Sequence, residues 1–358
     1  MKKLICCITL LFFLTNLTTQ LLACTTFCLI SKGEVLFGRN YDWNIGDALI
    51  LVNKKGVAKT ATAGESQTKV TPAKWVSKFG SVTFNQYGRE NPTGGMNEAG
   101  LVVELMWLDE SEYQKEESLP GVGSLEWIQY LLDTSATTAE ALKNAEHIRI
   151  VSDVKIHFLL NDKAGNAASV EFLNGKLVSH KGNELSVPVL ANDTYDNSIR
   201  YKSRIAPDKT MSSNSLDRFT RAALKTENFS RNPKAGQDAV NYAFEVLSNV
   251  AQKGYTQWSI VYDQKRGKIY FRTLQNAQIR SVDTSSFDYS CGTPVKMYEV
   301  SSNESGDVTP KFVDYTRKAN RELIDRSFAG TDFLKNIPPG IKLMLAAYPE
   351  KFVCAAGQ

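Results

Sequence analysis

The sequence predicts an α+β protein in which antiparallel sheets are covered by helices on their outer faces. Three observations lead to this fold class: strand-like segments occur in groups, helical segments occur in groups between them, and short polar turns join neighbouring strands. A parallel sheet would instead require strict alternation of strands and helices. With 358 residues, of which 42% are apolar and 22% charged, the chain can bury a large core.

The predicted strands are short apolar or alternating segments that end at Gly, Asn, Asp or Lys turns. Residues 25–30 and 34–38 flank the turn Ser31-Lys32-Gly33, so we expect them to form a hairpin directly after Cys24. The other predicted strands are residues 48–52, 81–84, 101–107, 155–160, 168–173, 188–191, 259–263 and 268–273.

The predicted helices carry apolar residues at three- and four-residue spacing, which is typical of a helix with one buried face. The clearest covers residues 138–146, because Thr137 and Glu140 form the Thr-x-x-Glu capping box. No repeat or linker rich in Pro, Gly or Ser interrupts the chain, and residues 283–306 are merely polar, so residues 24–358 are expected to form a single domain. The other predicted helices are residues 124–132, 216–226 and 237–251.

The N-terminus has the features of a cleavable signal peptide over residues 1–23. Lys2 and Lys3 precede the run 4–14, which is apolar except for Thr9, and a segment that resembles a cleavage site ends at Ala23. This run of 11 residues is too short to cross a hydrocarbon core, which needs about 20 residues, and no other segment approaches that length. We therefore expect a periplasmic or secreted protein without a membrane span.

The charge balance gives no argument for a nucleic-acid partner or an acidic membrane surface. The chain has 42 basic and 38 acidic residues, and removal of the signal peptide takes away two lysines, so the mature charge is nearly balanced. The mature chain keeps four cysteines. Cys28 lies between Phe27 and Leu29 in a predicted strand and is expected to be a buried small hydrophobe. Cys291 and Cys354 are expected either to form a disulfide with each other or to remain as two free thiols.

Cys24 at a mature N-terminus would combine two reagents. Its thiol is the best nucleophile among the side chains, and its α-amine, with a reference pKa of about 8, can accept a proton near neutral pH. One residue would then supply the nucleophile and the base of an amide hydrolase without a histidine. His147, His157 and His180 lie in no motif and far from any cysteine in sequence, so we interpret them as surface or core residues.

Two other interpretations of Cys24 compete with catalysis. Residues 21–24 nearly match a lipobox, in which the cysteine would be acylated and would anchor a non-catalytic binding protein. Against this, Leu22 is bulky for its position, and a strand follows instead of a flexible tether. In the other interpretation, cleavage occurs elsewhere and Cys24 is merely structural.

Arg39 and Asp42 are the first charged candidates near Cys24, because the predicted hairpin would fold them back beside it. A guanidinium near the sulfur favours the thiolate, and a carboxylate near the amine would orient it through hydrogen bonds. The alternative for the two residues is a surface ion pair that closes a turn.

Five short motifs follow one another along the mature chain. They are Cys24-Thr25-Thr26-Phe27, Phe37-Gly38-Arg39-Asn40-Tyr41-Asp42, Gly95-Met96-Asn97-Glu98-Ala99-Gly100-Leu101, Val189-Leu190-Ala191-Asn192-Asp193 and Asp217-Arg218-Phe219-Thr220-Arg221-Ala222. In this order they resemble the choloylglycine hydrolase family, which contains conjugated bile acid hydrolases and penicillin V acylases and belongs to the N-terminal nucleophile hydrolases. The resemblance implies a four-layer αββα sandwich of two antiparallel sheets flanked by helices.

The resemblance also implies roles at the reacting centre. Cys24 would be the nucleophile, Arg39 and Asp42 would hold its thiol and amine, and Arg218 would be a second arginine near the sulfur.

Two groups are implied as donors to the oxyanion: the side-chain amide of Asn192 and the main-chain N–H of Trp107. Without the family pattern, Asn192 would be interpreted as a turn residue before Asp193 and Thr194. The loss of one oxyanion donor typically lowers the rate by about 10²–10³.

Trp107 stands where bile acid hydrolases carry asparagine and several penicillin V acylases carry tyrosine. With Trp43 it resembles the tryptophan pair of the Gram-negative penicillin V acylase branch, some of whose members cleave N-acyl homoserine lactones; the alternative for each indole is ordinary core packing. Two indoles beside the thiol would favour a flat aromatic or long aliphatic acyl group. We therefore expect small-molecule N-acyl amide substrates such as penicillin V or N-acyl homoserine lactones, with conjugated bile acids as the alternative. No metal or cofactor is needed, and a homotetramer is expected by analogy with the family.

Overall fold

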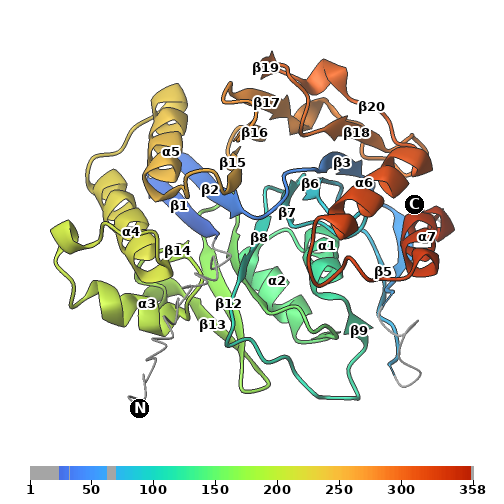
Figure 1. Cartoon of the computed structure of the whole chain (residues 1–358), viewed down its shortest axis with the longest axis horizontal. Helices are drawn as coiled ribbons and strands as arrows, with labels where there is room; N and C mark the ends of the chain where they lie inside the picture. The colour runs from blue at the N-terminus through green and yellow to red at the C-terminus, as the bar shows by residue number, and fades with distance from the viewer. Residues whose placement is uncertain (1–23, 32, 63–69, 356–358) are drawn as a thin grey trace, which may run out of the picture.

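Two largely antiparallel sheets lie face to face between layers of helices (Figure 1). The computed structural model describes residues 24–31, 33–62 and 70–355. The predicted signal peptide, residues 1–23, lies outside the described residues. The four-layer αββα arrangement expected from the sequence is confirmed.

The first sheet is built around the N-terminal hairpin. β1 (Thr25–Ser31) and β2 (Glu34–Asp42) pair with Thr25 opposite Asn40, and β15 (Thr256–Asp263) pairs with the other edge of β2. Every residue of β2 is buried, because the strand is covered on both faces. In the order β14-β1-β2-β15-β16-β17-β19, the other strands are β14 (Val189–Leu190), β16 (Lys268–Thr273), β17 (Arg280–Asp283) and β19 (Gly306–Asp307).

The second sheet has nine strands, in the order β13-β12-β11-β8-β7-β6-β3-β18-β20. They are β13 (Lys176–Lys181), β12 (Ala167–Leu173), β11 (Ile156–Asn161), β8 (Val102–Trp107), β7 (Gly94–Asn97), β6 (Ser81–Asn85), β3 (Leu49–Asn53), β18 (Lys296–Glu299) and β20 (Val313–Asp314). Two small sheets complete the chain: β9 (Gly121–Val122) with β10 (Arg149–Ile150), and β4 (Val57–Thr60) with β5 (Lys74–Val76) and β21 (Val353–Cys354).

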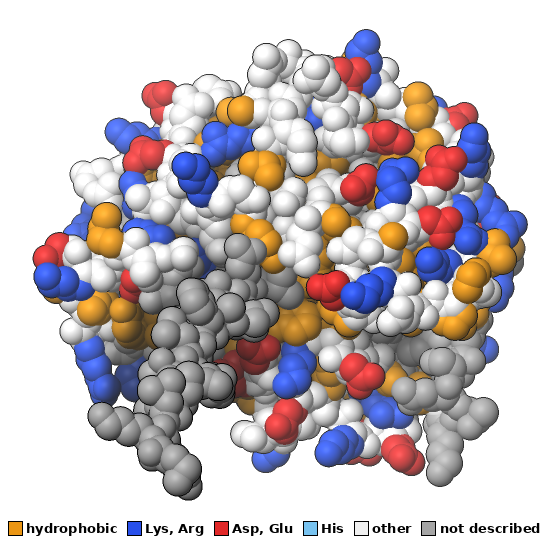
Figure 2. All heavy atoms as spheres, in the orientation of Figure 1, with side chains coloured by type: hydrophobic (Ala, Val, Ile, Leu, Met, Phe, Trp, Pro, Cys, Tyr) orange, Lys and Arg blue, Asp and Glu red, His pale blue; other side chains and the backbone are white. Residues whose placement is uncertain are grey.

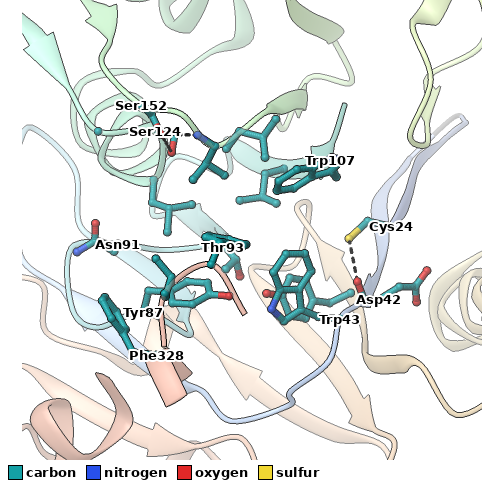
Figure 3. A pocket seen from close by; sticks show the side chains of 18 of the residues that line it. Cys24, Asp42, Trp43, Tyr87, Asn91, Thr93, Trp107, Ser124, Ser152 and Phe328 are labelled. Carbon is teal, nitrogen blue, oxygen red and sulfur yellow. Dashed lines mark hydrogen bonds between the residues drawn. The ribbon is translucent and has the colours of Figure 1, made fainter. Parts of the chain in front are cut away.

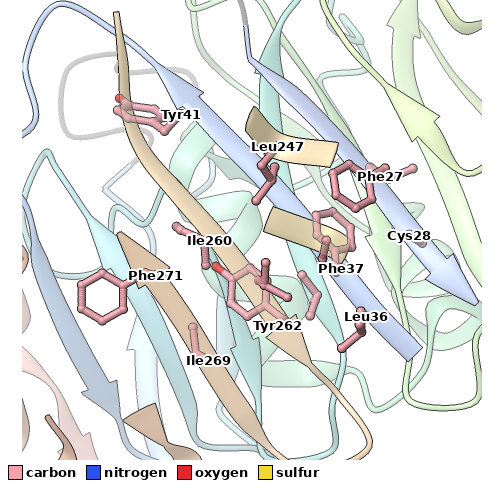
Figure 4. Close-up of a cluster of buried hydrophobic side chains, with 14 of the residues drawn as sticks. Phe27, Cys28, Leu36, Phe37, Tyr41, Leu247, Ile260, Tyr262, Ile269 and Phe271 are labelled. Atoms are coloured by element: carbon pink, nitrogen blue, oxygen red, sulfur yellow. The ribbon is translucent and has the colours of Figure 1, made fainter. Parts of the chain in front are cut away.

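The main core lies between the two sheets and beneath the helices that cover the first sheet. The rings of Phe84 on β6 and Phe271 on β16 meet with centroids 5.7 Å apart, so aromatic side chains join the two sheets directly. Leu247 of helix α5 packs toward Phe27 and Phe37 of the hairpin (Figure 4). This packing holds the β1–β2 hairpin, and hence Cys24, on both faces.

Helices α4 (Ser215–Arg231) and α5 (Gly236–Val250) cover the first sheet, where they contact β1 and β2. Helix α1 (Ser124–Thr134) covers the second sheet over β7 and β8, and α2 (Thr138–Ala145) packs beside it. The remaining helices are α3 (Tyr195–Lys202), α6 (Arg317–Ala329) and α7 (Pro339–Ala347).

The predicted strands and helices are all present, with ends displaced by a few residues. Helices α3, α6 and α7 were not predicted, because α3 and α6 are mostly polar and α7 begins at Pro339-Gly340. Residues 283–306 were interpreted as merely polar, which is wrong: β18 lies there. Its Met297 and Tyr298 are buried because the strand pairs with β3, a long-range contact that local composition does not reveal.

Cys291 and Cys354 form a disulfide, which resolves the two alternatives. Cys28 is a fully buried free thiol, as expected. No helix among the described residues is long and apolar enough to cross a bilayer. On the face shown in Figure 2, basic and acidic side chains are interspersed and no single sign of charge dominates.

Candidate active site

Cys24 directly precedes β1, and the hairpin returns the end of β2 to its side. The Sγ atom of Cys24 lies 4.0 Å from the main-chain oxygen of Asp42 (Figure 3). Only 4% of Cys24 is exposed, while Arg39 and Asp42 are fully buried. A surface ion pair between these two charged residues, the alternative considered above, is therefore wrong.

A β-bulge places the partners of the Asp42 carboxylate. The register of β15 against β2 shifts between Thr256 and Trp258, and bulges of this kind re-aim side chains beside functional sites. The Thr256 hydroxyl donates to Asp42 Oδ1 at 2.5 Å, and Gln252 Nε2 donates to Oδ2 at 3.3 Å. Burial raises the pKa of Asp42 to about 6, against the opposing charge of Arg218.

Arg39 forms a buried ion pair with Glu104 on the neighbouring sheet. The Tyr262 hydroxyl donates to Glu104 Oε1 at 2.5 Å, and Arg39 Nη1 donates to the main-chain oxygen of Thr93 at 3.1 Å. Gly94 makes room for this pair, because a Cβ atom there would lie 1.9 Å from Glu104 Oε2. Burial raises the pKa of Glu104 to about 7, although Arg39 opposes the shift.

The environment of the Cys24 thiol combines burial with positive charge. Burial raises the pKa of the thiol, and the charge of Arg39 lowers it in part. Within the described ranges, Nε and Nη2 of Arg39 have no oxygen or nitrogen partner, so these donors are not used by the ion pair. Because a thiol with a raised pKa stays protonated near neutral pH, it needs a neighbouring proton acceptor before it can attack.

Arg218 comes from α4 and contacts the main chain of Cys24 instead of its sulfur. Its Nη1 donates to the Cys24 carbonyl oxygen at 2.7 Å and also to Thr25 Oγ1, and its Nη2 donates to Asn192 Oδ1 at 2.9 Å. Its Nε donates to the main-chain oxygen of Ser213. Arg218 is fully buried and therefore fixes Asn192 relative to Cys24.

The side-chain amide of Asn192 is in turn held against β8. Its Nδ2 donates to the Trp107 carbonyl oxygen at 2.8 Å, which uses one of the two hydrogens of a primary amide. Next to Trp107, the main-chain N–H of Leu108 donates to Lys155 of the strand opposite, so Trp107 and Ile156 form a non-hydrogen-bonded pair. The N–H and C=O of Trp107 therefore both point away from β11, toward the side where Asn192 lies.

A cavity of about 230 Å³ opens beside the thiol. Cys24 and Asp42 lie at one end in Figure 3, and Tyr87, Asn91, Ser124 and Ser152 lie at the other, with the two indoles between them. The cavity walls are mostly apolar and aromatic. They include Tyr41, Trp43, Leu105, Trp107, Leu125, Val154, Ile156, Phe328, Phe333, Leu334 and Leu345.

The two predicted indoles line this cavity together. The ring centroids of Trp43 and Trp107 are 6.3 Å apart, and the Trp107 Nε1 donates to Asp109 Oδ1 at 2.7 Å. Trp43 also stacks on Tyr41, with centroids 6.2 Å apart. Both indoles also pack in or against the main core, so ordinary core packing, the alternative for each indole, describes only part of their surroundings.

Several residues of this region were not predicted from the sequence. Glu104, Thr256 and Gln252 contact Arg39 or Asp42 from other strands and loops, and no local motif marks them. Phe328, Phe333, Leu334 and Leu345 come from the C-terminal segment; the spacing of Leu323, Ile324 and Phe328 in the mostly polar α6 indicates a buried face but not that it lines this cavity.

None of the three histidines lines the cavity. The ring of His157 is buried and contacts the Ala191 carbonyl oxygen at 2.8 Å, so it supports the strand before Asn192. His180 lies near Asp196, and His147 is exposed.

The stacked sheets, the outer helices and a cysteine at the start of the first strand define the fold class of the N-terminal nucleophile hydrolases. A family model of linear amide C–N hydrolases, the choloylglycine hydrolase family, matches residues 24–203 and 211–296. The chain belongs to this family, and it is therefore an amidase that hydrolyses the C–N bond of linear amides.

Individual relatives agree with this assignment. The chain is similar to a penicillin V acylase from Pectobacterium atrosepticum, with 26% identity over 316 residues that cover 75% of this chain and 82% of the relative. Its structure is similar to that of penicillin V acylase from Agrobacterium tumefaciens, with a TM-score of 0.72, 29% identity, and coverage of 82% of this chain and 98% of the other. A conjugated bile acid hydrolase variant from Clostridium perfringens shares the fold, with a TM-score of 0.67, 18% identity, and coverage of 78% and 98%.

Proposed function

We propose that the mature protein is an exported amidase that hydrolyses N-acyl amides through an acyl-enzyme on Cys24. The observation that carries the proposal is that Cys24 lies at one end of an apolar cavity, beside Arg39 and Asp42, while Asn192 donates to the carbonyl oxygen of the cavity-lining Trp107. Residues 1–23 would be removed as a signal peptide, and residues 24–358 would form a single N-terminal nucleophile hydrolase domain in the periplasm or outside the cell.

In the proposed first step, the sulfur of Cys24 attacks the amide carbonyl carbon. The α-amine of the same residue takes the thiol proton, while Asp42 orients the amine and Arg39 stabilises negative charge on the sulfur. The C–N bond then breaks, and the amine returns the proton to the leaving nitrogen. The product of this half-reaction is a thioester on Cys24 and a free amine.

Water completes the reaction. The α-amine accepts a proton from water, the resulting hydroxide attacks the thioester carbonyl, and the C–S bond breaks to release the carboxylic acid and restore the thiol. In both half-reactions the tetrahedral oxyanion would accept hydrogen bonds from the second N–H of the Asn192 amide and from the Trp107 main-chain N–H. Arg218 would act as a positioning residue, because it holds both Asn192 and the carbonyl of Cys24.

The cavity supports a small apolar acyl group as the recognised part of the substrate. Its volume of about 230 Å³ is below the ~300–1,000 Å³ of pockets that enclose drug-sized ligands, so it suits a phenoxyacetyl or fatty acyl group better than a steroid. The similarity of the chain to penicillin V acylases also supports a small apolar acyl group. Penicillin V and N-acyl homoserine lactones are therefore the proposed substrate types, ahead of conjugated bile acids.

An amine-release assay tests the proposal. Purified mature protein should release amine from penicillin V or from an N-acyl homoserine lactone faster than from a glycine-conjugated bile acid, and Cys24→Ala should abolish the release while its circular dichroism spectrum stays unchanged. Equal turnover by wild type and Cys24→Ala would overturn the role of Cys24. Preferential turnover of the bile acid would overturn the substrate assignment.

A further inference from the structure

The C-terminal arm, residues 317–355, contributes a wall to the active-site cavity. It comprises α6, the turn at residues 330–338, α7 and β21. The family match ends at residue 296, so the arm lies beyond the matched residues. Four cavity-lining side chains nevertheless come from it: Phe328, Phe333, Leu334 and Leu345.

Phe333 connects the arm to the two indoles, which lie between the two ends of the cavity (Figure 3). Its ring centroid is 6.5 Å from that of Trp43 and 6.4 Å from that of Trp107, while the two indoles are 6.3 Å apart. The three rings thus form an almost equilateral triangle at distances typical of aromatic contact. We call Trp43, Trp107 and Phe333 the aromatic collar.

The arm is fixed to the body of the protein on both sides of the collar. On the N-terminal side, Asn320 Oδ1 accepts the main-chain N–H of Arg89 at 2.8 Å, and Arg326 pairs with Asp47 at 2.9 Å. On the C-terminal side, β21 pairs with β4, and the Cys291–Cys354 disulfide ties the end of the arm.

The turn between α6 and α7 also approaches the body closely. A Cβ atom on Gly330 would lie 2.5 Å from Ile45 Cγ2, so glycine permits this contact beside Trp43. The Tyr87 hydroxyl lies 3.2 Å from Thr331 Oγ1, and the ring of Tyr87 contacts that of Phe328 at 6.3 Å. The arm is therefore an integral part of the cavity wall.

We propose that Phe333 is a specificity-determining residue that selects an unbranched alkyl chain as the acyl group. This inference rests on the proposed amidase function. A slim alkyl chain can lie against the collar and along the aliphatic side chains of Leu105, Val154 and Leu345, which line the same cavity. A fused-ring acyl group would require Phe333 to be displaced.

The ring of Phe333 is half exposed, so it covers the collar on its solvent side. Without this ring, the methylenes of a bound chain would stay in contact with water, and each buried methylene otherwise favours binding. A short acyl chain does not extend to the part of the cavity that Phe333 shields from water, so its binding does not depend on this ring. Loss of Phe333 should therefore weaken the binding of long chains without slowing the chemical step.

The test compares N-butanoyl and N-octanoyl homoserine lactone, which share one leaving amine. Phe333→Ala should raise KM for the octanoyl substrate about tenfold, with kcat unchanged and the butanoyl parameters within about twofold of wild type. The KM of Phe333→Leu for the octanoyl substrate should lie between the values of wild type and Phe333→Ala. The matched control is Leu343→Ala, because Leu343 lies on α7 with similar exposure but does not line the cavity.

The outcomes separate the inference from the function on which it rests. If wild type releases amine from neither substrate nor from penicillin V, the amidase proposal itself fails. If wild type hydrolyses these amides but Phe333→Ala keeps the wild-type ratio of octanoyl to butanoyl kcat/KM, the inference is overturned and the amidase proposal stands. An equal change in Leu343→Ala would also overturn it, because the effect would then come from the stability of the arm.

Discussion

Replacement of Asn192 by alanine tests the proposed oxyanion site. In the structure its amide donates to the Trp107 carbonyl at 2.8 Å and accepts from Arg218 at 2.9 Å. Removal of one oxyanion donor should lower kcat by about 10²–10³, because the charge that it stabilises exists only in the transition state. Arg218 would keep its bonds to Ser213 and to the Cys24 carbonyl, so the free energy of unfolding should fall by only about 1 kcal/mol.

Steady-state kinetics with penicillin V and urea unfolding measure these two effects separately. Asn197→Ala is the matched control, since this asparagine donates to Asp193 at 2.7 Å and does not contact Trp107 or Arg218. A variant at Asn192 that raises KM and leaves kcat at the wild-type value would refute the reasoning. So would a loss of kcat that is fully explained by unfolding at the assay temperature.

Three further predictions concern groups around the site. Because burial raises the pKa of Asp42 to about 6 and its ionised form orients the amine, kcat/KM should fall more steeply as the pH drops below about 6 than protonation of the α-amine alone requires, and Asp42→Asn should lack this added steepness in a pH–rate profile. Glu104→Ala leaves the buried guanidinium of Arg39 unpaired and should lower the free energy of unfolding, measured in urea, by about 3 kcal/mol. Gly94→Ala crowds the carboxylate of Glu104 and should also lower the free energy of unfolding. Wild-type stability in both variants would contradict the assigned ion pair. The Cys291→Ser/Cys354→Ser double variant should lose about 2–4 kcal/mol in the same assay, because the disulfide closes a long loop of 63 residues, and an unchanged midpoint would contradict this.

The central fold was predictable because its signals are local. Alternating apolar residues mark the β1–β2 hairpin, and the capping box at Thr137 marks the start of α2, where the Thr137 side chain accepts the N–H of Glu140. Arg39 and Asp42 could be predicted to lie close to Cys24, because the local pairing of β1 with β2 alone returns them to its side.

Other features depend on contacts between distant segments and left no local trace. Glu104 pairs with Arg39 across two sheets, and Gly94 matters only because that carboxylate lies against it. β18 is a strand because β3 supplies its partner. Phe333 reaches the indoles only after the arm has folded back along the body, a placement that sequence spacing cannot indicate.

The account depends most on Cys24 as the first residue of the mature chain and the site of acylation. Intact mass spectrometry of the exported protein, acid-quenched during turnover of penicillin V, measures both at once. The account predicts a chain that begins at Cys24 and carries one phenoxyacetyl group, an increment that is absent from Cys24→Ala. A diacylglyceryl adduct on Cys24, or turnover with no acylated chain and residues 1–23 still attached, would contradict it.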